Sequence, residues 1–588
     1  AESHQISGEN TAVPSSTISI RETFKGKTVL VTGTSGFLGK VWLAMVLDAL
    51  PEVGKLIVLL RKKGLRPVSH RFEKMVGESP VFKPLHEKHG RDLARFIAER
   101  VEVVDGDIGR PNFGMTDEIA ARVAEETDLI VNCAGLVDFD PDVRDAIETN
   151  IDGALHAVEF TARCQNASVL HISTCYVAGE RSGRIPESVD VGYSPKGGRI
   201  DPAVELAAMQ TKILECEQKH SGEAYEAQLA DAIAARIAER GLDPNSATVQ
   251  RNVRKQEHDR IVKKAMEKLG VERAAILGWP NTYTWSKSLA EQLLKRRAHE
   301  LGVRYAILRP AIVESAVSFP FPGWNEGFNT SGPLVYLLGT WFRDLPQKPG
   351  NAFDVCPVDL VCKAMTVAGA ELLLDRHSEV YQAGSSDKNR FTVSRATEIT
   401  CLAHREYLRK NGKTFTERAI LSRADGVPVK PDHVMSMANI RKTAANLSKL
   451  FGRVADVAPK ALAKRAGEAR DALESADKEL KSVQRMTDLF LPFIHDNSWI
   501  FESDNLYKNT IAEPELAFDI RPIHWLSYWK DIQVPGLRRW CFPQFEGGTV
   551  ETYTPAVPFK MLPAGAPIAI PALPSLAPEA RPALRAVG

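Results

Sequence analysis

Three glycines spaced three residues apart, Gly33, Gly36 and Gly39, constrain the fold of this chain more than any other feature. They follow an apolar stretch at 27–32 that is typical of a buried strand, and they precede a helix predicted at 37–50. The first glycine permits a tight turn, the second lets the backbone approach a pyrophosphate, and the third allows the helix to pack closely on the strand. The helix N-terminus then faces the phosphate charge. In this context the pattern predicts a dinucleotide clamp.

Further short apolar stretches alternate with helical segments along the next three hundred residues. Strands are predicted at 56–60, 101–104, 129–132, 169–173 and 305–308. This alternation predicts an α/β protein with a doubly wound parallel sheet of the Rossmann type. Such a sheet places its ligand crevice at the carboxyl ends of its strands.

The chain has 588 residues, more than a single hydrophobic core usually supports, so we expect it to be divided. The predicted parts are a flexible N-terminal segment at 1–23, a Rossmann domain at 24–385, a mainly helical C-terminal domain at 386–550 and a Pro/Ala-rich tail at 551–588. Within the Rossmann domain, highly charged helices predict an insertion at about 202–270, with Gly241 and Gly270 ending two of them. The insertion is either a solvated appendage or a shield over the active site.

Composition excludes several classes of protein. A net charge of +1 provides no field that would attract nucleic acid. The eight cysteines form no CxxC pair and have no zinc-ligand spacing, so we expect no metal site and a reducing, cytoplasmic compartment. The chain has neither a signal peptide nor a run of about 18 apolar residues, so secretion and membrane spanning are not expected.

A run of six cations between Arg441 and Arg470 is opposed only by Asp456 and Glu468. The cations are Lys442, Lys449, Arg453, Lys460, Lys464 and Arg465. Such a run is usually a solvated face, but a basic amphipathic helix can also contact anionic lipid headgroups or other phosphates. Peripheral membrane association and a homodimer are therefore left open.

Basic residues follow the second predicted strand, where an NAD-specific fold would offer a carboxylate to the adenosine ribose. Arg61, Lys62 and Lys63 stand there instead, and a cation can pair with the 2′-phosphate of NADP. We therefore expect NADPH rather than NADH, the alternative being an exposed basic loop. The residues expected against the cofactor are Gly33, Thr34, Ser35, Gly36, Phe37, Leu38, Gly39, Arg61, Lys62, Asp107, Ile108, Ala134, Gly135, Tyr283, Lys287, Pro310 and Ile312.

Tyr283 and Lys287 lie one helical turn apart, so both side chains project from one face of a helix. A free tyrosine has a pKa of about 10, and a neighbouring ammonium stabilises the phenolate and lowers it. The spacing is common by chance, but the upstream clamp makes a proton-transfer pair the better interpretation. At the carboxyl end of the fifth predicted strand, Ser173 or Thr174 can steady a substrate oxygen.

The residues described so far resemble the extended short-chain dehydrogenases, through Gly33–Gly39, Ser173–Val177 and Tyr283-x-x-x-Lys287. The segment from Arg309 to Trp324 is similar to fatty acyl-CoA reductases in particular. Phe518–Ile520 and Trp525–Trp529 resemble the C-terminal "male sterility" domain of alcohol-forming members, and the resemblance runs from Phe24 to Phe542. The charged insertion is similar to that of the bacterial, wax-ester-associated branch.

The resemblance implies that residues 24–385 form an NADP-binding reductase domain. It further implies that two NADPH reduce a long-chain fatty acyl-CoA to the aldehyde and then to the fatty alcohol, with release of CoA. Thr174, favoured by its distance from Gly179, and Tyr283 would stabilise the oxyanion, and Tyr283 would protonate the alcohol. The alternatives are a reductase that stops at the aldehyde or uses carrier-bound thioesters, a sugar-nucleotide epimerase, and a nonenzymatic NADP sensor.

Overall fold

A parallel sheet of seven strands forms the centre of the protein, for which the computed structural model describes residues 17–326, 330–431, 439, 441, 445–449 and 460–562. The strand order is β12-β8-β6-β5-β2-β3-β4, and all pairs are parallel. The strands are β2 (Thr28–Thr32), β3 (Lys55–Leu60), β4 (Val101–Asp105), β5 (Leu129–Asn132), β6 (Ser168–Ile172), β8 (Arg304–Pro310) and β12 (Val380–Ala383). The predicted fold class is confirmed.

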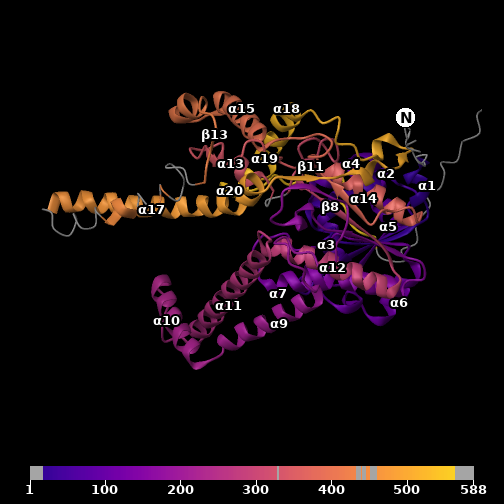
Figure 1. Cartoon of the computed structure of the whole chain (residues 1–588), viewed down its shortest axis with the longest axis horizontal. Coiled ribbons are helices and arrows are strands. Elements are labelled where there is room, and N and C mark those ends of the chain that lie inside the picture. Colours follow the sequence, from indigo (N-terminus) through magenta and orange to yellow (C-terminus); the bar gives the residue numbers. More distant parts are fainter. Residues whose placement is uncertain are drawn as a thin grey trace, which may run out of the picture.

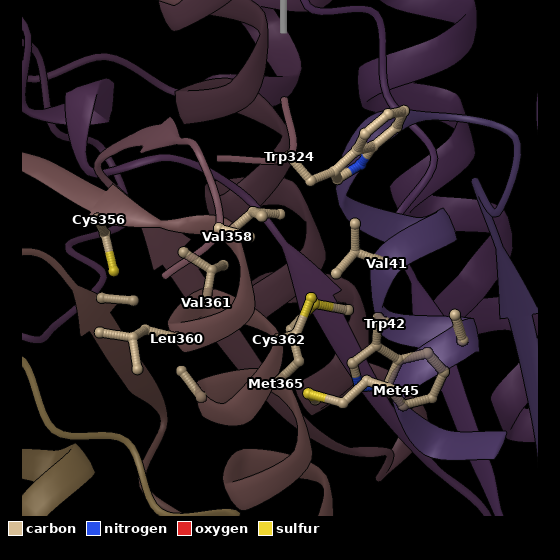
Figure 2. Packing of buried hydrophobic residues seen from close by; sticks show 14 of the residues in the cluster. Val41, Trp42, Met45, Trp324, Cys356, Val358, Leu360, Val361, Cys362 and Met365 are labelled. Carbon is tan, nitrogen blue, oxygen red and sulfur yellow. The ribbon is translucent and has the colours of Figure 1, made fainter. Parts of the chain in front are cut away.

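Helices cover both faces of this sheet, which is why its strands are mostly apolar. In β2, Val29 and Val31 face one helical layer while Leu30 faces the other. The helices of these layers and the connections are α2 (Phe37–Ala49), α3 (Val68–Glu78), α4 (Lys83–His89), α5 (Leu93–Arg100), α6 (Asp117–Glu126), α7 (Val143–Ala146), α8 (Gly153–Arg163), α12 (Thr282–Leu301) and α14 (Val358–Leu373). The first layer is built around α2 and α14, whose packing Figure 2 shows.

Three helices form the predicted insertion and project from the sheet (Figure 1). They are α9 (Pro202–Lys219), α10 (Glu223–Arg240) and α11 (Ala247–Leu277). Buried residues of α9 and α11 belong to the hydrophobic core on the Leu30 side of the sheet. Helix α10 packs on α11 through a separate, small hydrophobic cluster. Gly241 ends α10 in a left-handed conformation, as predicted, but Gly270 lies inside α11. A Cβ at Gly270 would meet Thr282, so this glycine serves close helix packing instead of capping.

The N-terminal segment is shorter than predicted, because residues 17–24 are folded. Thr17–Ile18 forms β1, and Ile20–Phe24 forms α1, whose Ile20 and Phe24 are buried. The Glu513 carboxylate accepts hydrogen bonds from the Ser19 hydroxyl at 2.7 Å and from the Ile20 amide at 2.9 Å. This long-range anchor, which a local reading of a polar segment cannot detect, ties the start of the chain to its C-terminal region. Residues 1–16 lie outside the described residues.

Helices dominate the region after residue 385, but short strands tie it to the first part of the chain. Its helices are α15 (Val393–Asn411), η6 (Glu417–Leu421), α17 (Lys460–Leu491), η7 (Pro492–Asp496), α18 (Trp525–Ser527), η10 (Tyr528–Gln533), α19 (Val534–Trp540) and α20 (Phe542–Phe545). Strand β14 (Trp499–Phe501) pairs with β7 (Gly183–Ile185), and β15 (Thr510–Ile511) pairs with β1. Residues 551–562 of the predicted tail have no regular structure, and 563–588 lie outside the described residues.

Smaller elements connect the sheet to this region. Strand β9 (Ile312–Glu314) pairs with β11 (Val355–Pro357), helix α13 (Gly332–Leu337) follows, and β10 (Asp344–Pro346) pairs with β13 (Val427–Val429). Among the described residues, no helix is both long and apolar enough to cross a membrane. In the same part of the chain, no group of three or more His, Cys, Asp or Glu residues is arranged to hold a metal ion.

Candidate active site

The glycine turn between β2 and α2 brings two backbone segments into close contact. Gly33 has a φ of +78°, and a Cβ there would lie 2.5 Å from the Ala134 nitrogen. The Gly36 amide donates to the Gly33 carbonyl at 3.0 Å and begins α2, while a Cβ at Gly39 would collide with that same carbonyl. Only glycine fits at the first and third positions of the turn, in agreement with the tight turn and the close helix packing that the glycine spacing predicts.

Unsatisfied polar groups at this turn fit a bound phosphate. The Thr34 hydroxyl is buried and has no hydrogen-bond partner in the described structure, and no side chain caps the N-terminus of α2. A buried hydroxyl without a partner is costly, and the free amides of a helix N-terminus attract anions. The turn, Thr34 and the start of α2 at Phe37 and Leu38 thus fit the pyrophosphate of a dinucleotide.

A group of basic residues lies beside the turn, at the end of β3, and we call Arg61, Lys62 and Arg71 the basic corner. Arg61 is exposed and pairs with Asp107 at 3.7 Å, and the Lys62 amide donates to Asp105 at 3.1 Å. Arg71 of α3 bridges the corner, since its guanidinium donates to the Ser35 hydroxyl at 3.0 Å and to the Arg61 carbonyl at 2.8 Å.

Arg71 could not be identified from the sequence, because its position at the basic corner depends on how α3 packs. Partial burial, together with the neighbouring Arg61, lowers the pKa of Arg71. An anion between the two guanidiniums would relieve this unfavourable proximity. The hydrogen bond from Arg71 to Ser35 also places the corner directly next to the glycine turn.

Asp107 and Ile108 follow β4, two strands away from the glycine turn. The Asp107 carboxylate accepts from the Gly109 amide at 3.1 Å, and its amide donates to the Phe113 carbonyl at 2.6 Å. The Ile108 side chain lies over Gly153, where a Cβ would stand 2.9 Å away. The pair is thus placed at the carboxyl edge of the sheet, on the side of Arg61.

Ala134 and Gly135, just after β5, lead into the centre of the site. A Cβ at Gly135 would lie 2.9 Å from the Lys287 Nζ and 3.3 Å from the Asn150 Oδ1. Asn150, in the π-helical turn η4 (Ile147–Asp152), accepts from the Leu136 amide at 2.9 Å and donates to the Ser286 hydroxyl at 3.0 Å. Asn150 thus fixes this loop against α12. No sequence signal marked it, because a lone asparagine in a helix is common.

Thr174, Tyr283 and Lys287 meet at the carboxyl edge of the sheet. Thr174 caps the short helix after β6, accepts from the Tyr176 amide at 3.3 Å, and shares a side-chain hydrogen bond with Tyr283. Lys287, one turn along α12, is buried and donates to the Ile172 carbonyl at 3.0 Å. Segments more than a hundred residues apart thus bring a hydroxyl, a phenol and an amine together.

Ser173 is buried in a different environment from Thr174. Its amide donates to the Leu308 carbonyl at 2.8 Å, but its hydroxyl has no partner among the described residues. The structure therefore pairs Thr174, and not Ser173, with the phenol of Tyr283. Ser173 remains a second hydroxyl at the same strand end.

Burial governs the ionisation of the two central groups. It raises the pKa of Tyr283 to about 12, with the Thr174 hydrogen bond acting in the opposite direction. The pKa of Tyr283 is therefore above that of a free tyrosine and not below it as expected, because desolvation of the phenolate outweighs the Thr174 hydrogen bond. Burial also lowers the pKa of Lys287 to about 8. Near neutral pH, Tyr283 thus carries its proton and Lys287 is charged.

Pro310 and Ile312 line the next stretch of the edge. The Pro310 carbonyl accepts from the Thr174 hydroxyl at 3.5 Å, and the Ile312 amide donates to the Asp354 carbonyl at 3.1 Å. Pro310 thus lies beside Thr174, while Ile312 begins β9 and is partly buried. Beside this stretch, a cavity of about 240 Å³ is lined in part by the buried ion pair of Arg309 and Glu291.

Aromatic residues from the C-terminal region complete one wall of the site. The Tyr283 amide donates to the Phe139 carbonyl at 3.1 Å, and the ring of Phe139 stacks on Phe493 at 5.6 Å. Phe493 also meets the edge of Tyr176, two residues after Thr174, at 4.9 Å. The region after residue 385 thus reaches the predicted catalytic residues, which the sequence could not reveal.

The predicted basic face at 441–470 cannot be placed. Lys442 and Arg453 lie outside the described residues, as do the side chains of Lys460, Lys464 and Arg465. Only Lys449 of this set is described, and it is exposed.

Comparisons with known proteins agree with this geometry. A family profile described as "Male sterility protein" matches residues 31–365. "Probable fatty acyl-CoA reductase 4" of Arabidopsis thaliana is 28% identical over 537 residues, covering 87% of this chain and 96% of the relative. "Alcohol-forming fatty acyl-CoA reductase" of Simmondsia chinensis is 28% identical over 534 residues, covering 88% and 98%. The solved reductase domain of a nonribosomal peptide synthetase from Mycobacterium tuberculosis aligns with 91% of this chain and 95% of its own, at 16% identity and a TM-score of 0.48.

Proposed function

Since the chain belongs to the Male sterility protein family, we propose that it uses NADPH to reduce long-chain fatty acyl-CoA to the fatty alcohol, through an aldehyde and with release of CoA. The observation that carries the proposal is the meeting of Thr174, Tyr283 and Lys287 beside the glycine turn. That arrangement combines a nucleotide site with a proton donor at one edge of the sheet. The names of the relatives support the choice of substrate and product.

The residues around the turn would hold the cofactor. Gly33, Gly36 and Thr34 would bind the pyrophosphate, and Lys287 would hold the ribose hydroxyls of the nicotinamide half. When bound, NADPH supplies the hydride for reduction of the carbonyl carbon. Arg61 and Arg71 support NADPH over NADH, since guanidiniums suit the 2′-phosphate, which would replace the exposed 3.7 Å pairing of Arg61 with Asp107.

Thr174 and Tyr283 would act on the substrate oxygen. As the thioester carbonyl gains electrons, its oxygen becomes an oxyanion, and the two hydroxyls would stabilise that charge by hydrogen bonding. Collapse of the tetrahedral adduct breaks the carbon–sulfur bond and releases CoA as the thiolate. In the second reduction the aldehyde oxygen becomes an alkoxide, and Tyr283 would give it a proton to form the alcohol. The full conversion consumes four electrons and therefore two NADPH.

Lys287 would support this proton transfer through its charge. Its ammonium lies against the Ile172 carbonyl and close to Gly135, in a buried position from which it would reach the nicotinamide ribose. A cation there favours the phenolate that Tyr283 becomes after it has given up its proton. The Lys287 amine would then pass a replacement proton from solvent to Tyr283.

The direct test is an assay of the purified chain with palmitoyl-CoA and NADPH, with cofactor oxidation and lipid products followed together. We expect two NADPH to be oxidised per hexadecanol formed, and Tyr283→Phe should lower kcat by about 10²–10⁴-fold. Arg71→Ala should raise KM for NADPH at least about tenfold and leave KM for NADH unchanged. No NADPH oxidation at any acyl chain length would overturn the proposal. Accumulation of hexadecanal would show instead that the reaction stops at the aldehyde.

A further inference from the structure

Val137 is an exposed apolar side chain in the loop that follows β5 at the catalytic edge. It exposes 55% of its surface, whereas Leu136 and Phe139 on either side of it are partly buried. Single exposed aliphatic residues are common on protein surfaces and need no function. Val137 differs from them because the backbone before and after it is fixed to α12, the helix that carries the proton donor.

The first fixed point lies directly before Val137. The Asn150 side chain accepts from the Leu136 amide at 2.9 Å and donates to the Leu136 carbonyl at 3.1 Å, so both polar groups of this backbone unit are held. The Asn150 amide also donates to the Ser286 hydroxyl at 3.0 Å, which ties the unit to α12. Ser286 directly precedes Lys287 in the sequence. Residue 136 is therefore held beside the proton-transfer pair.

The second fixed point lies two residues after Val137. The Phe139 carbonyl accepts from the Tyr283 amide at 3.1 Å, at the start of α12. Consecutive Cα atoms are about 3.8 Å apart, so Val137 cannot lie far from the backbone that bonds Tyr283. An ordered, exposed, apolar side chain thus stands next to the predicted catalytic tyrosine.

The apolar surface continues from Val137 into the C-terminal region. The ring of Phe139 meets the edge of Phe490 at 5.8 Å, in the last turn of α17. Helix α17 projects from the rest of the molecule (Figure 1), and its last turns reach the catalytic edge through Phe490. Met486 lies one helical turn before Phe490 and, like Phe139, is partly buried against the same core. We call Val137, Phe139 and Met486 the apolar strip.

We propose that the apolar strip receives the acyl chain of the substrate, with Val137 against the first carbons after the carbonyl and Met486 against carbons farther along. This inference rests on the proposed function, because it starts from a thioester carbonyl held by Thr174 and Tyr283. Val137 and Met486 then act on specificity at different distances from the reacting carbon.

The chemistry of the two substituents on the carbonyl carbon supports this assignment. One substituent is an alkyl chain, and the other is the sulfur of CoA with an arm that contains amides. Covering Val137 with methylene groups removes apolar surface from water on both partners. Amides placed on the same side chain would lose hydration without gaining a hydrogen bond. The strip therefore suits the alkyl chain and not the CoA arm.

The variant Val137→Thr tests the first contact, because threonine keeps the branched shape and replaces one methyl group by a hydroxyl. We expect kcat/KM to fall at least about fivefold with butyryl-CoA and with palmitoyl-CoA alike, since both have the first carbons. Val137→Ile, which keeps the apolar surface, should retain the kcat/KM of the parent with both substrates. An unchanged kcat/KM for Val137→Thr with both substrates would overturn the proposal.

The variant Met486→Ser tests the distal contact. It should lower kcat/KM at least about fivefold with palmitoyl-CoA and leave that of butyryl-CoA unchanged, because a four-carbon chain ends before this position. The matched control is Ile276→Thr on the insertion, where the branched side chain is 62% exposed, and it should behave like the parent with every substrate. An equal loss for Met486→Ser with both substrates would contradict the proposed direction of the chain.

Reduction of the aldehyde separates the acyl chain from the CoA arm. Hexadecanal has the same alkyl chain as palmitoyl-CoA but no CoA, so Val137→Thr should slow the reduction of both. If this variant slowed only the thioester, Val137 would contact the CoA arm, and the assignment of the strip would be wrong.

A binding measurement distinguishes failure of the strip from failure of the proposed function. Calorimetric titration of the Tyr283→Phe variant with palmitoyl-CoA, in the presence of NADP⁺, measures affinity without turnover. Adding Val137→Thr to this variant should raise the Kd at least about fivefold. If the parent oxidised no NADPH but this difference in Kd were found, the proposed function would fail and the strip would stand. Equal Kd values would overturn the strip whatever the rates are.

Discussion

Thr174 and Ser173 are adjacent hydroxyls, but only Thr174 shares a hydrogen bond with Tyr283. If Thr174 helps to stabilise the oxyanion, Thr174→Val should lower kcat by about 10²–10³-fold, because an isosteric methyl replaces the donor. Ser173→Ala should cost less than about tenfold, since it removes a hydroxyl without a protein partner. Steady-state rates with palmitoyl-CoA check both values. A larger loss for Ser173→Ala would reverse the assignment.

Lys287 predicts how activity depends on pH. Burial lowers the pKa of its ammonium to about 8, whereas Tyr283, with a pKa of about 12, keeps its proton throughout the accessible range. The charged form of Lys287 is therefore present below pH 8 and is lost as the pH rises through that value. We expect kcat/KM for NADPH, which reports on the free enzyme, to fall above pH 8.

The pH profile needs a control for unfolding. Circular dichroism at each pH should stay constant across the descending limb, so that the loss belongs to titration and not to denaturation. A rate that stays level up to pH 10 would contradict the assigned role of the Lys287 charge.

Residues whose role follows from their spacing along the chain can be predicted from the sequence. Residues whose role depends on tertiary packing cannot. The glycines are required by the tight turn, and the Tyr283–Lys287 pair is defined by the spacing of one helical turn. The structure brings both to the carboxyl edge of the sheet. Arg71 and Asn150 act through partners many residues away, Ser35 and Leu136 respectively. The pKa of Tyr283 was predicted with the wrong sign because desolvation cannot be judged before burial is known.

At the scale of elements, the strand–turn–helix unit of β2 and α2 contains two glycines whose roles can be distinguished by experiment. A Cβ at Gly39 would collide with the Gly33 carbonyl, whereas a Cβ at Gly36 has its nearest neighbour at 3.4 Å. Gly39→Ala should therefore destabilise the fold by about 1–3 kcal/mol, as overpacking does. Gly36→Ala should fold normally but raise KM for NADPH at least about tenfold, because the methyl stands where the phosphate approaches.

Thermal unfolding and cofactor titration distinguish the two glycine variants. Gly26→Ala provides no suitable control, because Gly26 has a φ of +69°, so Gly39→Ala and Gly36→Ala must be judged against the parent alone. If Gly36→Ala bound NADPH like the parent, the turn would not form the pyrophosphate site.

Six of the seven strands of the central sheet were predicted within one or two residues, because each is a short apolar run, whereas β12 was not predicted. The predicted strand at 129–132 coincides with β5, and that at 56–60 differs from β3 by one residue. The two-residue and three-residue strands β1, β7, β14 and β15 were not predicted. They are too short to produce a period, and each is defined by its partner rather than by its own residues.

At the scale of the whole molecule, the parts of the chain before and after residue 385 are joined. Strand β14 pairs with β7 just after the Thr174 segment, and the Trp499 indole donates to the Gly179 carbonyl at 3.0 Å. Buried residues from both sides of residue 385 belong to the same core, among them Phe391, Trp529 and Val355. The division at 385 remains a prediction, but the contacts imply that the two parts unfold together.

Trp499 tests this cooperativity, because its ring is buried among Tyr176, Phe493 and Phe501. Trp499→Ala should lower the free energy of unfolding by about 3–5 kcal/mol, through the lost contacts and the remaining cavity. Calorimetry should show one transition, shifted as a whole, since the lost packing lies between the two parts. Activity should also fall, because Tyr176 supports the backbone that holds Thr174.

Trp341→Ala is the matched control, since the same side chain is removed from a position that is 62% exposed. Its effect on the free energy of unfolding should stay within about 0.5 kcal/mol, as is usual for surface substitutions. Two separate transitions in the parent, with only one of them lowered by Trp499→Ala, would mean that the parts are independent. In that case the aromatic wall around Phe493 would be a docked surface, and the catalytic edge would keep its structure when the C-terminal region unfolds.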